Sequence, residues 1–60
     1  MYKKYIIVWR NQYIRDVFIQ ELKDSEYHFD IINHNLYVLE NEINYVENIM
    51  NDFNIAYKTS

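Results

Sequence analysis

The chain has 60 residues, of which half are hydrophobic and 18% aromatic, and it carries a formal net charge of −3 at pH 7. It contains no Cys, Gly or Pro, which excludes disulfides and thiolate metal sites and leaves the turns to other residue types. A chain of this length forms one small domain, residues 1–60, and buries only about 60% of its unfolded surface. We therefore expect self-association or a larger partner to stabilise it.

A strand is predicted at residues 3–9. Three β-branched residues at 6–8 are flanked by Tyr5 and Trp9, a composition that strands favour. Because apolar side chains occupy both faces of this segment, we expect a central strand that is covered on both sides.

A helix is predicted at residues 12–23, with Asn11 placed to cap its first turn. Apolar side chains recur along it at helical spacing, which indicates one buried stripe. That stripe is formed by Ile14, Val17, Phe18 and Leu22, with Tyr13 and Ile19 at its edges. Asp24 and Ser25 follow and end the helix.

Residues 26–32 alternate between apolar and polar side chains, which predicts a half-exposed strand at a sheet edge. Residues 33–35 are predicted to form a hairpin turn in which Asn takes the role of Gly. Residues 36–39 form the returning strand, which is again apolar on both faces.

A second helix is expected to begin at Asn41, which can cap it, and to carry Glu42 in its first turn. Its buried stripe is formed by Ile43, Val46, Ile49, Met50 and Phe53. Asn54 can end the helix, because Asn tolerates the left-handed conformation. Residues 55–57 have enough β character for a short last strand.

The resulting order is β-α-β-β-α-β, the split βαβ order of ferredoxin-like domains. The predicted fold class is therefore α+β, with two helices on one face of an antiparallel sheet. In this arrangement the first and third strands lie at the centre, which agrees with their two apolar faces. The fourth strand has the weakest pattern, and its loss would leave βαββα.

If both helices cover one face of the sheet, the opposite face keeps an uncovered apolar patch on the first and third strands. That patch consists either of Tyr5, Ile7, Trp9, Tyr37 and Leu39, or of Ile6, Val8, Leu36 and Val38. Contiguous apolar patches mark interaction sites. We take the first set as the candidate sheet-face interface, which serves a homodimer or a foreign partner.

The charges are distributed unevenly along the chain. Residues 24–57 contain seven acids and no Lys or Arg, whereas residues 1–23 contain five basic residues and two acids. This uneven distribution of charge predicts a partner protein with a basic surface. The candidate partner-binding surface is the polar face of the second helix, although codon bias on a solvated face gives the same pattern. Its residues are Glu40, Asn44, Glu47, Asn48, Asn51 and Asp52.

His28 and Asp30 share one face of the second strand. Their spacing suits an acid–base pair or half a metal site, but it equally suits polar residues on a wet strand edge. The sequence shows no nucleophile with a base, no Gly-rich phosphate loop and no paired carboxylate cleft beside them. We therefore predict no enzymatic activity, no cofactor and no metal.

Tyr5, Trp9 and Tyr37 are placed like the stacking aromatics of an RNA-binding sheet. The acidic balance and the absence of a basic, Gly-rich run at residues 36–39 argue against nucleic acid. The sequence also contains no apolar run of transmembrane length, and the run at residues 5–9 is too short for a signal peptide. We therefore expect no membrane partner and a cytoplasmic location.

Length, acidic balance, lack of Cys and an Ile-, Asn- and Tyr-rich composition resemble those of small phage-encoded proteins that disable host factors. Anti-CRISPR and other anti-defence proteins, antitoxin-like RNase inhibitors and DNA mimics belong to this class. The resemblance rests on no motif and assigns no residue. It implies a non-enzymatic inhibitor, acting in the host cytoplasm, that occludes a basic site on a nucleic-acid-handling or defence protein. The alternatives are a homodimeric structural or regulatory module and an RNA-binding sheet platform.

Overall fold

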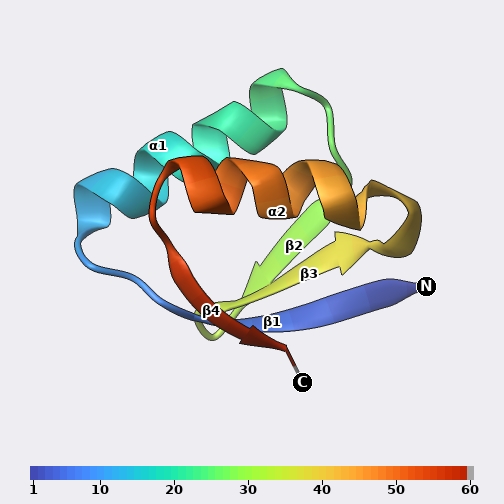
Figure 1. Ribbon diagram of the computed structural model, residues 1–60, viewed down its shortest axis with the longest axis horizontal. Helices are drawn as coiled ribbons and strands as arrows, with labels where there is room; N and C mark the ends of the chain where they lie inside the picture. The colour runs from blue at the N-terminus through green and yellow to red at the C-terminus, as the bar shows by residue number, and fades with distance from the viewer. Residues whose placement is uncertain (60) are drawn as a thin grey trace.

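The computed structural model describes residues 1–59 and has two layers, with both helices packed on one face of a four-stranded sheet (Figure 1). Its elements are β1 (Tyr2–Val8), α1 (Gln12–Asp24), β2 (Phe29–Ile32), β3 (Asn35–Leu39), the 3₁₀ turn η1 (Glu40–Glu42), α2 (Ile43–Asp52) and β4 (Ala56–Thr59). This order confirms the predicted α+β arrangement, including its fourth strand.

The strands are ordered β2-β3-β1-β4, and each neighbouring pair is antiparallel. This is the ferredoxin-like order, with β1 and β3 at the centre as their two apolar faces predict. β2 and β4 form the edges. The two central strands position every other element, because both helices lie across them (Figure 1).

Backbone amides at both ends of α1 form hydrogen bonds with nearby residues of the chain. The side chain of Asn11 accepts a hydrogen bond from the amide of Ile14 at 2.8 Å, which confirms the predicted cap. At the other end Glu26 adopts a positive φ of 60°, and the amide of Tyr27 donates to the carbonyl of Leu22. This is a Schellman ending, and it delays the second strand to Phe29 rather than residue 26.

A two-residue turn joins β2 to β3. Asn33 and His34 both have positive φ, 51° and 71°, as a type I′ hairpin requires. Asn35, which the sequence placed in the turn, is the first residue of β3. The tight turn fixes the register between the two strands.

The second helix starts differently from the prediction and ends as predicted. Residues 40–42 form η1, and the starts of η1 and α2 have no side-chain cap, so the expected cap at Asn41 is wrong. Asn54 ends the helix with a φ of 55°. The amide of Ile55 then donates to the carbonyl of Met50 at 2.9 Å, the second Schellman ending in the chain.

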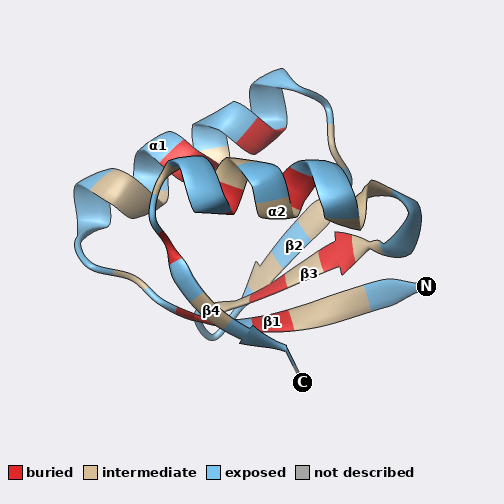
Figure 2. Ribbon diagram, in the orientation of Figure 1, coloured by how far each residue is buried: buried red, intermediate tan, exposed pale blue. Residues whose placement is uncertain are grey.

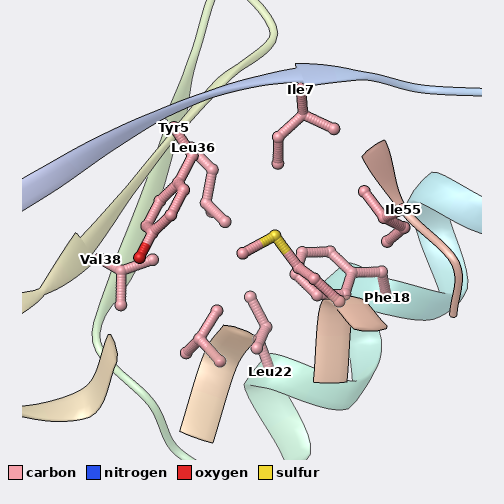
Figure 3. Close-up of a cluster of buried hydrophobic side chains, with 9 residues drawn as sticks. Tyr5, Ile7, Phe18, Leu22, Leu36, Val38 and Ile55 are labelled. Carbon is pink, nitrogen blue, oxygen red and sulfur yellow. The ribbon is translucent and has the colours of Figure 1, made fainter. Parts of the chain in front are cut away.

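The core lies between the two layers, where the inner sides of the helices meet the sheet (Figure 2). Figure 3 shows the side chains from the sheet and those from the helices pointing toward one another. The buried residues are Tyr5, Ile7, Phe18, Leu22, Leu36, Val38, Val46, Met50 and Ile55. Phe18 anchors the end of this cluster next to Trp9, with ring centroids 5.8 Å apart.

The pairing of β1 with β3 decides which side chains share a face. Tyr5 is paired with Leu36, and Lys4 is paired with Tyr37. Paired residues project to the same side of a sheet. Tyr5 therefore lies with Leu36 under the helices and not with Tyr37.

The predicted sheet-face interface is consequently wrong in its first-strand members. Tyr5 is 0% exposed, Ile7 is 5% exposed, and Trp9 packs half-buried against the core. The alternative set is wrong in its third-strand members, because Leu36 and Val38 are both 0% exposed. The uncovered face combines one half of each set: Ile6 and Val8 from β1 with Tyr37 and Leu39 from β3.

Candidate functional site

Two surfaces on opposite sides of the molecule are candidates for function. We call the outward side of α2 and η1 the acidic helix surface. It consists of Glu40, Asn44, Tyr45, Asn48, Asn51 and Asp52, all of which are exposed. It points away from the sheet, because Val46 and Met50 turn the opposite side of α2 into the core (Figure 2).

The acidic helix surface follows from the helical repeat. Asn44, Asn48 and Asn51 recur at intervals of four and three, which places them on one side of a helix. Asn is a weak helix former, so three of them make α2 less stable than Ala or Lys would. They are exposed and do not fill the core, so packing does not account for them.

Glu47 does not belong to this surface, although the sequence assigned it there. The hydroxyl of Tyr5 donates a hydrogen bond to its carboxylate at 2.5 Å, and Lys3 Nζ lies 3.9 Å from the same oxygen. Burial, followed by the hydrogen bond to Glu47, raises the pKa of the Tyr5 hydroxyl far above its ordinary value. Glu47 therefore ties α2 to β1 and is already partnered inside the protein.

One member of the acidic helix surface, Tyr45, forms an aromatic pair. The ring of Tyr45 stacks on that of Tyr27, with centroids 6.0 Å apart and planes inclined by 11°. Tyr45 remains 58% exposed. The partner-binding surface predicted from the sequence did not include Tyr45. Tyrosines held in place and partly exposed are common anchors of protein interfaces.

A second carboxylate holds the start of β2 against η1. One carboxylate oxygen of Glu42 accepts a hydrogen bond from the backbone amide of His28 at 2.7 Å. The other oxygen lies 3.1 Å from Nδ1 of His28. The bond from the His28 amide is the main reason that the pKa of Glu42 lies below its ordinary value. His28 is thus engaged with Glu42, not paired with Asp30 as a catalytic or metal-binding couple.

The second surface is the uncovered side of the sheet, which we call the open sheet face. Its side chains come from all four strands: Asp30 and Ile32 of β2, Asn35, Tyr37 and Leu39 of β3, Tyr2, Lys4, Ile6 and Val8 of β1, and Ala56 and Lys58 of β4. Four of its hydrophobic side chains are between 42% and 68% exposed. Water therefore reaches a broad apolar area here.

The open sheet face is hollowed in two places. A shallow depression of about 400 Å³ is lined by Tyr2, Phe29, Asp30, Ile32 and Tyr37. Another of about 230 Å³ is lined by Ile6, Val8, Ala56, Tyr57 and Lys58. Both are mostly apolar, which suits the side chains of a second protein better than a small polar substrate.

A hollow of about 510 Å³ lies between α1 and β2. Its polar lining consists of Arg15, Asp16, Gln20, Lys23 and Asp30. Arg15 lies 3.6 Å from Asp16, so part of this charge is already neutralised. The mixture of exposed basic and acidic groups provides neither an activated nucleophile nor a matched acid and base.

Among residues 1–59, no three His, Asp or Glu side chains gather closely enough to hold a metal ion. Neither helix in this range combines the length and the apolar character needed to cross a membrane. No family model, curated protein or solved structure matches the chain.

Proposed function

We propose that this protein is a non-enzymatic binding module that recognises a basic protein surface through the acidic helix surface. It acts as a phage-type inhibitor, which covers a site on a nucleic-acid-handling or defence protein. The single observation that carries this proposal is the outward side of α2, where exposed Asn and acidic side chains occur with no Lys or Arg between residues 24 and 57.

The chemistry of the acidic helix surface supports a basic partner. Asn44, Asn48 and Asn51 offer amide donors and acceptors, while Glu40 and Asp52 supply negative charge at either end. A basic protein groove that normally holds phosphates presents Lys and Arg donors to such groups. Tyr45 adds an aromatic side chain that can be desolvated at the centre of the contact.

The mechanism requires no chemical step. Exposed acids attract a basic partner over a distance of about one Debye length, which raises the association rate. Once docked, α2 and the layer behind it exclude the natural ligand from the occupied site. The compact shape, 28 × 25 × 19 Å, is large enough to fill a groove that admits a nucleic-acid duplex.

The test neutralises Glu40→Gln and Asp52→Asn together and compares this variant with Glu21→Gln plus Asp24→Asn on α1. Both double variants change the net charge equally, and all four side chains are exposed. Partners are captured from a bacterial lysate with each tagged protein, and association rates of the recovered protein are then measured at low and high salt.

The α2 variant should associate several-fold more slowly than wild type, while the α1 variant should change little, because steering depends on charge near the contact. Added salt should reduce the difference. Equal slowing in both variants would contradict the assignment of the site to α2. Faster association after neutralisation would contradict the proposal, since it would show that the partner surface is acidic and not basic.

A further inference from the structure

We infer that the open sheet face is covered by a second copy of this chain, in an isologous dimer whose two-fold axis runs parallel to the strands. This inference concerns a surface opposite to the acidic helix surface, so it stands apart from the proposed function. It depends on where the strand pairing places the charges of the open sheet face.

Strand pairing orders these side chains into rows across the sheet. Asp30, Tyr37 and Lys4 form one row across β2, β3 and β1. The next row, across all four strands, consists of Ile32, Asn35, Ile6 and Lys58. The face therefore carries its acid at the β2 edge and a lysine at the β4 edge, with Tyr37, Asn35, Ile6 and a second lysine, Lys4, on the central strands between them.

Two arrangements can bring two such faces together by a two-fold rotation. An axis perpendicular to the strands lays β2 over β2 of the second copy. When it passes through the row of Asp30, it sets Asp30 beside Asp30 of the second copy and Lys4 beside Lys4 of the second copy. Like charges then meet at a surface that loses its water, which is costly.

An axis parallel to the strands gives the opposite result. It lays β2 over β4 of the second copy and β3 over β1, with the strands nearly aligned as in sandwiches. Asp30 then approaches Lys58 of the second copy, and Lys4 approaches the ring of Tyr37 of the second copy, a favourable cation–π geometry. Only this axis makes the charge pattern of the face complementary to itself.

The overall charge distribution favours the same contact. The protein is net negative, but the open sheet face carries two lysines and one acid. Two copies can therefore meet through this face with their acidic helix surfaces directed outward and away from each other. Contact through the outward side of α2 would instead oppose acids to acids.

The area of the open sheet face limits the size of this dimer interface. Four strands about 4.8 Å apart offer a face about 20 Å wide and about 20 Å long. Two such faces bury on the order of 1,000 Å² in total, the lower end of specific interfaces. We therefore expect a dimer that forms at micromolar concentration and dissociates on dilution.

The first measurement is sedimentation equilibrium of the wild-type protein from micromolar to near-millimolar concentration. A reversible monomer–dimer equilibrium is expected, and Ile6→Lys, at the centre of the face, should abolish it. Tyr13→Lys is the matched control, because Tyr13 is 73% exposed on α1, outside the open sheet face. A wild-type monomer throughout, or a dimer that survives Ile6→Lys, would overturn the inference.

The axis is tested by exchanging charges. Asp30→Lys alone and Lys58→Asp alone should each weaken self-association by about tenfold or more, because two attractive pairs become repulsive. An equal mixture of the two variants should form a heterodimer close to wild type in affinity, since both cross-pairs are then complementary. Failure of the mixture to associate better than either variant alone would exclude the parallel axis.

A labelled single-stranded oligonucleotide provides the competing outcome. Tyr2, Tyr37 and the two lysines could stack on and neutralise a nucleic acid instead. If the wild-type protein binds the oligonucleotide at a concentration at which it remains monomeric, and Tyr37→Ala abolishes that binding, the second copy is the wrong occupant. Absence of binding under the same conditions supports the dimer.

Discussion

Among residues 1–59, four adopt positive φ although the chain contains no Gly: Glu26, Asn33, His34 and Asn54. Asn tolerates this conformation because its short amide bonds to the local backbone, whereas Glu does not have that compensation. Glu26 keeps its positive φ because two backbone amides at the end of α1 can then donate hydrogen bonds to carbonyl groups of the helix. The Schellman ending of α1 therefore stores strain at one residue.

Glu26→Gly should stabilise the protein. Relief of the left-handed conformation, worth about 1–2 kcal/mol, exceeds the added freedom of Gly in the unfolded chain, about 0.5–1 kcal/mol. The melting temperature should rise by a few degrees. Glu21→Gly, on the exposed side of α1 in its last turn, is the control and should lower stability by up to about 1 kcal/mol. A fall of similar size in both variants would show that Glu26 carries no strain.

The Glu42–His28 contact predicts a particular response to acid. The folded-state pKa of Glu42 is lowered, so folding favours its charged form. The resulting stabilisation is complete above the pKa of Glu in the unfolded chain, about 4.3, and disappears as the pH falls through the lower folded-state value. Thermal melts of Glu42→Gln should therefore change less with pH below about 4.3 than those of wild type.

Glu40→Gln is the control for this experiment. Glu40 is an exposed acid in the same turn, so its neutralisation changes the net charge equally. The acid sensitivity of this variant should match that of wild type. If both variants lose sensitivity to the same extent, the effect belongs to net charge and not to the contact with His28.

At the scale of elements, aromatic packing connects α1 to the segments that follow β1 and α2. Phe18 is fully buried, and its ring lies 5.8 Å from Trp9 and 6.0 Å from Phe53, measured between centroids. It thus joins α1 to the end of β1 and to the end of α2. Phe29 of β2 is only half-buried and occupies the sheet edge.

Phe18→Ala should cost about 3–5 kcal/mol, which is comparable to the total stability of a chain this short and should unfold it. The milder substitutions Phe18→Leu and Phe29→Leu should leave the protein folded, so their losses of stability can be measured and compared. Urea denaturation should show a clearly larger loss for Phe18→Leu, because only that site is enclosed on all sides. Equal losses would mean that α1 does not close the core in the manner described.

The element order was predictable because each helix and strand has its own period. Val46 and Met50 repeat at helical spacing, and so do the exposed Asn44 and Asn48, which the structure places on the outer side of α2 as expected. Periodicity within a single element was sufficient for these assignments.

The faces of the sheet were not predictable in the same way. Residues 5–8 are all apolar, so hydrophobicity cannot decide which alternate residues of β1 face the helices. The pairing of Tyr5 with Leu36 decides it, through the register of β1 and β3. The bond between Tyr5 and Glu47, which are 42 positions apart, likewise has no local signal.

At the scale of the whole molecule, part of the charge asymmetry is used internally. Arg10 donates to the carbonyl of Phe53 at the end of α2, where a cation is favourable, and Lys3 lies near Glu47. These contacts link the basic first part of the chain to its acidic second part. Glu40 and Asp52 lie exposed on the outward side of the helical layer, where they can act on a partner.

The separation of the helices from the open sheet face has a consequence for stoichiometry. Because the two surfaces point in opposite directions, a pair of chains joined through their sheets would present two acidic helix surfaces facing outward (Figure 1). Such a pair is bivalent: it could hold two partner molecules, or two sites on one oligomeric partner, at the same time. Against an oligomeric target the second contact is intramolecular, so its avidity could exceed the affinity of a single chain by about 10²–10⁴ when the spacing fits.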